Sequence, residues 1–223
     1  MREHLSLEAD DLGATEPAPE QTSRSSRGSR IARSEFLKKA AVTGGVLGLG
    51  GALIGGLPDF SAAAPPSAAM DVRILNFFLR LEYLQAAFYA EASSSGALTG
   101  EPAEFAQTVG EHELAHVAFL EELLGDDAED EPSFDFGDAT SSDDAFTRSA
   151  LTLEETTSAA YIGQGANLTS DRMLAAARIV SVEARHAAWI RDIFGQNPAP
   201  LAADTAMSEA EVTAAIKDTG FVG

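Results

Sequence analysis

The sequence contains no cysteine. The chain can therefore form no disulfide, no thiolate zinc site and no rubredoxin-type iron centre, and no lipid can be attached through a thiol. Positive charge is also scarce: 15 lysines and arginines stand against 35 aspartates and glutamates, which gives a formal net charge of −20. Because nucleic-acid binding depends on basic patches that pair with phosphates, this composition argues against a nucleic-acid partner.

Lysine is nearly missing from most of the chain, since Lys217 is the only lysine after Lys39. An acidic, lysine-poor surface suits a high-salt habitat, where screening reduces the repulsion between like charges. A GC-rich genome would produce the same bias, and the composition leaves both explanations open. The length of 223 residues is enough for one hydrophobic core with additional segments.

The N-terminal part has the features of an export signal. Residues 1–35 are polar without apolar periodicity, which predicts disorder. A basic stretch at 33–39 precedes the uncharged segment 40–57, and small-residue sites follow at 62–64 and 67–69. A basic region, an apolar region and an Ala-x-Ala site together are typical of a cleaved signal.

The basic stretch resembles a twin-arginine signal, because Arg33 is followed by Phe36-Leu37-Lys38. Ser34 stands where that signal has its second arginine. The alternative is an uncleaved membrane anchor, although the glycines in 40–57 make a poor one. We therefore assign 1–69 to a disordered N-terminus and export signal. We expect a periplasmic, cell-surface or extracellular protein that meets a membrane only through an uncleaved signal.

Beyond this region the sequence predicts an all-α bundle. Apolar residues recur at helical spacing in four segments, which are expected at about 71–93, 102–125, 142–163 and 171–195, the last behind Ser170 as its cap. Two short connections make two helical hairpins, and the long acidic connection 125–141 suits a single crossover between them. The cation-binding alternative for this connection is weaker than a solvated loop.

The C-terminal tail carries one further element. Ser208 and Glu211 have the spacing of a capping box, with Met207 and Val212 placed for a hydrophobic staple. This predicts a short helix at about 208–217. The expected domains are therefore a four-helix bundle at 70–195 and a tail with a short helix at 196–223.

Six polar residues interrupt the apolar stripes of the four segments. In chain order they are Glu82, Glu113, His116, Glu154, Glu183 and His186. The two histidines belong to Glu-x-x-His patterns, and all six lie near the middle of their segments. In an antiparallel bundle, residues at matched heights meet in one layer.

Energy gives a reason for the layer. Four ionised carboxylates buried without a cation would each cost several kcal/mol. Two divalent metal ions would balance four carboxylates while both imidazoles stay neutral. A mixed set of carboxylate and imidazole ligands favours iron or manganese. The sequence thus predicts two divalent metal ions held by these six residues, with iron preferred to manganese.

An internal repeat supports the same site. Tyr89 follows Glu82 by seven residues, and Tyr161 follows Glu154 by seven. The two hairpins therefore look like related halves around a pseudo-twofold axis. Either phenol could donate a hydrogen bond to a ligand carboxylate, and His112 could lie behind the ligands or on the bundle surface.

The strings around these residues resemble the exported ferritin-like domain proteins, including the desiccation-related type. They are Ile74-Leu75-Asn76-Phe77, Leu81-Glu82-Tyr83-Leu84, His116-Val117-Ala118-Phe119-Leu120 and Val182-Glu183-Ala184-Arg185-His186. The resemblance implies an antiparallel ferritin-like four-helix bundle whose metals are bridged by Glu113 and Glu183. It also implies activation of oxygen or peroxide, or oxidation of ferrous ion. We expect small-molecule partners and a monomer or small homo-oligomer.

Other readings remain. A non-catalytic metal-binding protein that protects against stress would need the same six residues. A storage shell is weaker, because nothing in the sequence specifies a cage. His112-Glu113-Leu114-Ala115-His116 also matches the zinc protease motif. A protease would leave Glu82, Glu154 and the second Glu-x-x-His unexplained, so this alternative is distant.

Overall fold

The computed structural model describes residues 65–222, and these residues form helices without strands. The long helices are α2 (Ala68–Ser95), α3 (Gly100–Leu124), α4 (Asp143–Gly165) and α5 (Ser170–Ile193), and the short elements are η2 (Gly125–Asp127) and α6 (Glu209–Thr219). The predicted all-α bundle with a short C-terminal helix is confirmed. The predicted export signal and the disordered N-terminus lie almost wholly outside the described residues. None of the described helices is long and apolar enough to cross a membrane.

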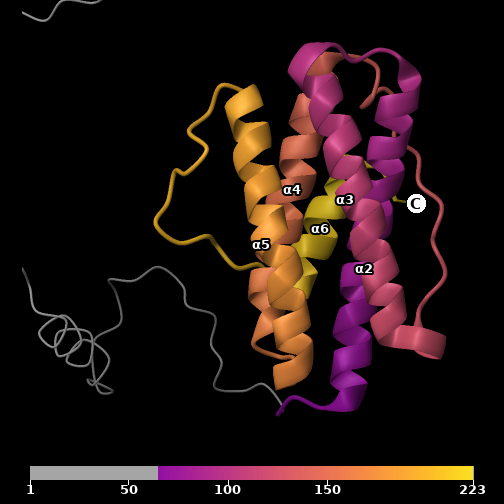
Figure 1. The fold of residues 1–223 in the computed structure, drawn as a ribbon, viewed down its shortest axis with the longest axis vertical. Coiled ribbons are helices and arrows are strands. Elements are labelled where there is room, and N and C mark those ends of the chain that lie inside the picture. The colour runs from indigo at the N-terminus through magenta and orange to yellow at the C-terminus, as the bar shows by residue number, and fades with distance from the viewer. Residues whose placement is uncertain (1–64, 223) are drawn as a thin grey trace, which may run out of the picture. The chain divides into compact units, whose positions relative to one another are not determined.

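The four long helices run side by side, and α6 lies behind them (Figure 1). Helix α2 packs mainly on α3, and α4 packs mainly on α5, which forms the two expected hairpins. The connection between α3 and α4 runs along the bundle from one end to the other (Figure 1). As a result α4 is parallel to α3 and antiparallel to α2, and a pseudo-twofold axis can relate the hairpins.

Serine side chains begin three of the helices. Ser67 and Ser142 accept hydrogen bonds from the backbone N–H groups three residues later, and Ser208 forms the predicted capping box with Glu211. The prediction that Ser170 caps α5 is wrong, because Thr169 is the cap residue and Ser170 is already helical. The reason is tertiary: Thr169 makes no cap bond within its helix but is held by a carboxylate of another helix.

Two aspartates clamp the hairpins to each other. The backbone N–H and the hydroxyl of Thr169 donate to Asp71 at 2.9 and 2.6 Å. In the same way, the N–H and hydroxyl of Thr99 donate to Asp143 at 2.9 and 2.8 Å. Each aspartate stands eleven residues before the mid-helix glutamate of its own helix, Glu82 or Glu154. These equivalent clamps fix the height of each helix relative to the opposite hairpin.

The crossover is attached to the outer face of α2. The Asn76 amide donates to the Asp127 carbonyl and accepts from the Glu129 N–H, both at 2.8 Å. Arg80 forms an ion pair with Glu129, and the Tyr83 hydroxyl donates to the Glu129 carbonyl at 3.4 Å. The acidic connection is therefore used for attachment, and no candidate metal cluster of the described residues includes it.

Aromatic rings fill the core beyond the level of the glutamates. Phe88 stacks on Phe146 with the centroids 5.5 Å apart and contacts Phe136 and Phe221 at 5.4 and 6.0 Å. Phe221 thus ties the C-terminal tail to the bundle. At Gly163 the tail comes so close that an added Cβ would lie 1.9 Å from the Met207 carbonyl oxygen, and only glycine fits this contact.

Candidate metal centre

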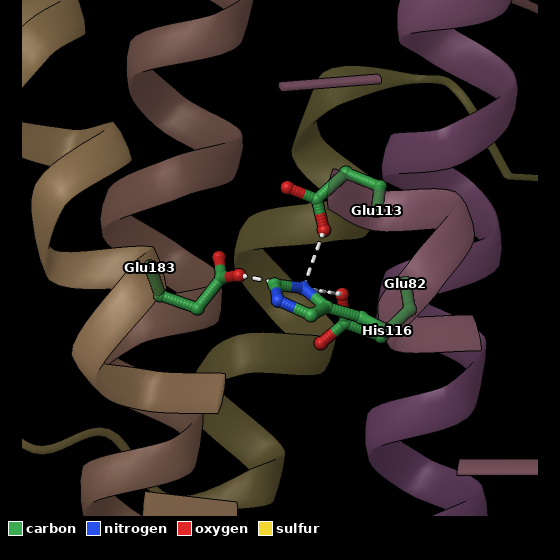
Figure 2. A group of neighbouring side chains, drawn as sticks. All are labelled: Glu82, Glu113, His116 and Glu183. Carbon is green, nitrogen blue, oxygen red and sulfur yellow. Dashed lines mark hydrogen bonds and ion pairs between the residues drawn. The ribbon is translucent and has the colours of Figure 1, made fainter. Parts of the chain in front are cut away.

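All six predicted residues converge in one buried layer. The carboxylates of Glu82, Glu113, Glu154 and Glu183 have no solvent exposure, and His116 and His186 are 9% and 3% exposed. Figure 2 shows four of them, with the His116 imidazole in the centre and the carboxylates directed toward it from three helices. Each glutamate lies on the inward face of its helix, within a stripe of apolar residues, so the four carboxylates point into the core.

One group of ligand atoms surrounds His116. Its Nδ1 lies 3.2 Å from Oε2 of Glu82, 3.2 Å from Oε2 of Glu113 and 3.1 Å from Oε1 of Glu183. These four residues can each offer one atom within 4.8 Å of the others (Figure 2). We call this group the His116 position.

A second group surrounds His186. Its Nδ1 lies 3.1 Å from Oε1 of Glu113, 3.4 Å from Oε2 of Glu154 and 3.8 Å from Oε1 of Glu183. We call this group the His186 position. Glu113 presents one oxygen to each position and Glu183 takes part in both, which is the arrangement of two bridging carboxylates between two terminal ones.

The layer is not satisfied by its own hydrogen bonds. Buried atoms without a hydrogen-bond partner among the described residues are Glu113 Oε1, Glu154 Oε2, both carboxylate oxygens of Glu183 and His186 Nδ1. Buried polar atoms in proteins are almost always paired, because an unpaired one costs about 1–3 kcal/mol. These atoms lie at the His186 position or belong to Glu183, which serves both positions, whereas Oε2 of Glu82 and Oε2 of Glu113 at the His116 position both contact Nδ1 of His116. Both positions consist of oxygen and nitrogen donors, so the donor set fits two metal ions.

Without metal, the layer retains protons. Burial, together with the charges of Glu82 and Glu154, raises the pKa of Glu113 well above its usual 4.5, although His116 opposes this. Burial and the charge of Glu113 likewise raise the pKa of Glu183. The carboxylates can therefore not all be ionised together unless cations neutralise them.

The pKa values of the two imidazoles are raised, whereas burial alone would lower them. Burial lowers the pKa of His116, but its contacts with Glu113, Glu183 and Glu82 raise it to about 12. The pKa of His186 is raised because Glu154 outweighs burial. Burial acts to raise the pKa of Glu82, but its contacts with His116 and Tyr161 outweigh burial, so the pKa of Glu82 is lowered from 4.5. Metal ions would replace the protons that these pairs hold.

The two phenols cross between the hairpins. Tyr89 on α2 donates to Oε1 of Glu154 on α4, and Tyr161 on α4 donates to Oε1 of Glu82 on α2 at 2.5 Å. In both carboxylates this leaves Oε2 for a metal. Burial and the neighbouring carboxylates raise both phenol pKa values well above 10.0, so the phenols stay protonated donors. Gly110 lets α3 approach this point, since an added Cβ would lie 3.1 Å from Cβ of Tyr89.

His112 lies outside the ligand layer and does not join the zinc motif. Its Nδ1 is 2.9 Å from Nε2 of His186, and the planes of the two rings are nearly parallel, at 11°. The converging groups of ligand atoms among the described residues do not include it. Burial and the charge of His186 lower the pKa of His112, which suits an acceptor. This geometry therefore does not support the protease alternative.

Comparison with known families agrees with the geometry. A family model described as a ferritin-like domain matches residues 70–196, more than half of the chain. The chain belongs to the ferritin-like domain family. A comparison with curated proteins finds no match. Membership agrees with the all-helical bundle, and the buried clusters are compatible with metal binding in this ferritin-like domain.

Two buried polar residues beside the ligand layer were not predicted from the sequence. Gln85 is fully buried and donates to Glu154 at 2.9 Å, and Thr157 donates to the Gln85 carbonyl at 2.5 Å. A signal was present, because Gln85 stands three residues after Glu82 and Thr157 three after Glu154. Each extends the polar face of its helix into the core.

Proposed function

We propose that this ferritin-like protein binds two divalent metal ions, iron rather than manganese, and uses them on oxygen, peroxide or ferrous ion. The observation that carries the proposal is the convergence of buried ligand atoms at the His116 and His186 positions, where the ligand atoms of the His186 position and both oxygens of Glu183 have no hydrogen-bond partner among the described residues. Two metal ions held by these residues would supply Lewis-acid polarisation of a bound small molecule and, with iron or manganese, redox chemistry.

The protein's own residues would prepare this centre. Glu82 and Glu154 would bind one ion each, and the bridging Glu113 and Glu183 would hold the pair together. Tyr89 and Tyr161 would orient the terminal carboxylates by donating to the oxygens that face away from the ions.

The surrounding core would keep water out of the layer. Phe78 stacks on Tyr161 with the centroids 3.9 Å apart, and Leu79, Leu120 and Leu153 are fully buried. Exclusion of bulk water strengthens every electrostatic interaction of the centre and protects reactive species from side reactions.

We further propose that the chain is an exported member of the family, of the desiccation-related type. The basic and uncharged segments before residue 58 support export. A cut near 62–64 would leave Ser67 in place to cap α2, whereas a cut after Ala69 would remove that cap. Mass spectrometry of the N-terminus of the protein recovered outside the cytoplasm tests this, and a chain that stays in the cytoplasm with its N-terminus intact contradicts it.

A non-catalytic, metal-stabilised protein is the second candidate. The complete burial of the four carboxylates supports it, because a reacting centre needs access for its substrate. A metal pair that only holds the hairpins together would protect the protein under stress without turnover.

The test is metal content and turnover of the full chain. Plasma mass spectrometry should find about two irons per chain, and two manganeses instead would contradict the preference for iron. The Glu113→Gln/Glu183→Gln variant should lose them. The charge-matched control Glu104→Gln/Glu122→Gln, which changes two exposed residues of α3, should keep them. Absence of metal in the wild-type chain, even after reconstitution with ferrous or manganous ion, contradicts the proposal.

Ferrous oxidation in air and peroxide consumption then separate the two candidates. Turnover by the loaded wild-type chain, lost in the double variant and kept in the control, supports the oxidoreductase. Two bound metals with a raised melting temperature but no turnover support the structural role.

A further inference from the structure

The two metal positions have the same ligand types but different surroundings. Each has one histidine, one terminal glutamate and the two shared glutamates. If the pseudo-twofold axis were exact, the residues behind these ligands would match as well. They differ in three places, and all three differences favour the His186 position.

The first difference is the support of the histidine. When Nδ1 of His186 faces a metal ion, its ring proton is on Nε2, which lies 2.9 Å from Nδ1 of His112. His112 can thus accept this proton in a hydrogen bond and hold the ring. The equivalent residue of the other hairpin, four before His186 rather than His116, is Val182, which has no acceptor. Within the described residues, every polar contact of His116 involves its Nδ1.

The second difference is the support of the terminal carboxylate. Oε1 of Glu154 accepts from both Tyr89 and the Gln85 amide. Among the described residues, Oε1 of Glu82 accepts from Tyr161 alone, because Thr157 takes the place equivalent to Gln85 and donates to Gln85 instead. Two donors fix the carboxylate of Glu154 in the orientation that leaves Oε2 free.

The third difference is access. The His116 side chain is 11% exposed, whereas the His186 side chain is 4% exposed behind His112. A ligand that is partly open to solvent exchanges its metal more easily than one that is enclosed.

We infer that the two positions bind metal unequally: the His186 position fills first and retains its ion, and the His116 position fills second and exchanges it. His112 is the positioning residue that sets this order. Outer contacts of this kind change metal affinity by about 10–100-fold. The inference rests on the proposed di-metal site and deepens it, because it distinguishes a resident ion from an exchangeable one.

The test is a titration of the metal-free full chain with zinc ion, followed by the ring nitrogen signals of 15N-labelled histidine. Zinc is a diamagnetic stand-in, so each Nδ1 signal reports its own coordination. The chain has four histidines, and variants assign their signals. We expect the His186 Nδ1 signal to move with the first equivalent and the His116 signal with the second.

Two variants test the role of His112. His112→Phe keeps a flat ring without the acceptor, and we expect the two signals to move together. Val182→His introduces a ring at the equivalent place, and we expect the His116 signal to move earlier than in wild type. Signals that move together in wild type, or an unchanged order in His112→Phe, would overturn the inference. Neither signal moving at any zinc concentration would instead contradict the di-metal site itself.

Discussion

Two buried parts of the bundle differ in what they need in order to be stable. The aromatic cluster, formed by Phe88, Phe136, Phe146 and Phe221, consists of rings in contact with one another. The ligand layer in the middle of the same helices is buried equally well but leaves carboxylate oxygens and an imidazole nitrogen without partners. The aromatic cluster lowers the free energy of the folded chain by itself, whereas the ligand layer raises it until cations arrive.

This difference separates residues that serve the fold from residues that serve a function. Rings can be explained by burial of apolar area alone. Four glutamates in the same core cannot, because an apolar side chain at each place would pack without electrostatic cost. The expected consequences differ accordingly: damage to the aromatic cluster should cost stability, and damage to the ligand layer should cost metal.

The largest difference between the two regions is expected from the Glu113→Gln/Glu183→Gln variant. The variant should fall from about two metals per chain to none. Its metal-free melting temperature should equal or exceed that of the metal-free wild type, because neutral amides replace carboxylates that burial disfavours. Calorimetry of both metal-free chains checks this. A large drop in melting temperature would mean that the two glutamates serve the fold.

Phe88→Ala should have the opposite effect, a loss of stability without a loss of metal. Phe88 has no solvent exposure and touches three other rings of the cluster, so the cavity should cost about 3–5 kcal/mol of unfolding free energy. The metal count per folded chain should not change. Urea unfolding and metal analysis measure the two quantities separately, and a lost metal in a folded variant would show that the regions are coupled.

The pH dependence of the metal-free chain sharpens the comparison. The folded pKa values of Glu113 and Glu183 lie above 4.5, and that of His116 is raised from 6.5 to about 12. The folded state therefore holds protons that the unfolded state has released, and stability falls as pH rises above about 4.5. For each such proton, the free energy of unfolding falls by about 1.4 kcal/mol per pH unit between the unfolded and the folded pKa of its group.

Melting temperatures measured from pH 5 to pH 9 check this. The metal-free wild type should melt at lower temperature as pH rises, and the metal-loaded chain should not, since metal ions replace the protons. A metal-free chain that is most stable at high pH would contradict the layer of retained protons.

The phenols give a smaller effect. Tyr89→Phe removes a donor from Glu154, and metal affinity should fall about 10–100-fold while the fold persists. Tyr83→Phe is the matched control, because its hydroxyl also donates to a glutamate of the bundle but away from the ligands. Competition with a chelator measures both affinities. Equal affinities in the two variants would remove Tyr89 from the metal site.

The smallest effect is expected at the start of α6, which belongs to neither region. Ser208→Ala removes the cap of α6 and should cost about 1 kcal/mol of unfolding free energy without a change in metal content. The pair of measurements used for Phe88→Ala applies here too. A loss above about 3 kcal/mol would mean that α6 stabilises the bundle more than its cap contact suggests.

Much of this architecture could be predicted from local pattern. The helical repeat of apolar residues located the four long helices to within a few residues, and the Ser208–Glu211 spacing located α6. The convergence of the glutamates could be expected because equal heights in a bundle place residues in one layer. The residue that caps α5 could not be predicted in the same way, since Thr169 is held by Asp71 from a helix far away in sequence.

The sequence by itself determined the helices, the halves and the six candidate ligands, because these follow from periodicity and spacing along one chain. Only the tertiary structure decided which groups stand behind the ligands. Tyr89 reaches Glu154 rather than the glutamate of its own helix, and His112 reaches His186 rather than His116. The reason is that α2 packs against α4 and α3 packs against α5, which brings side chains of opposite hairpins together. That pairing depends on packing in three dimensions rather than on distance along the sequence.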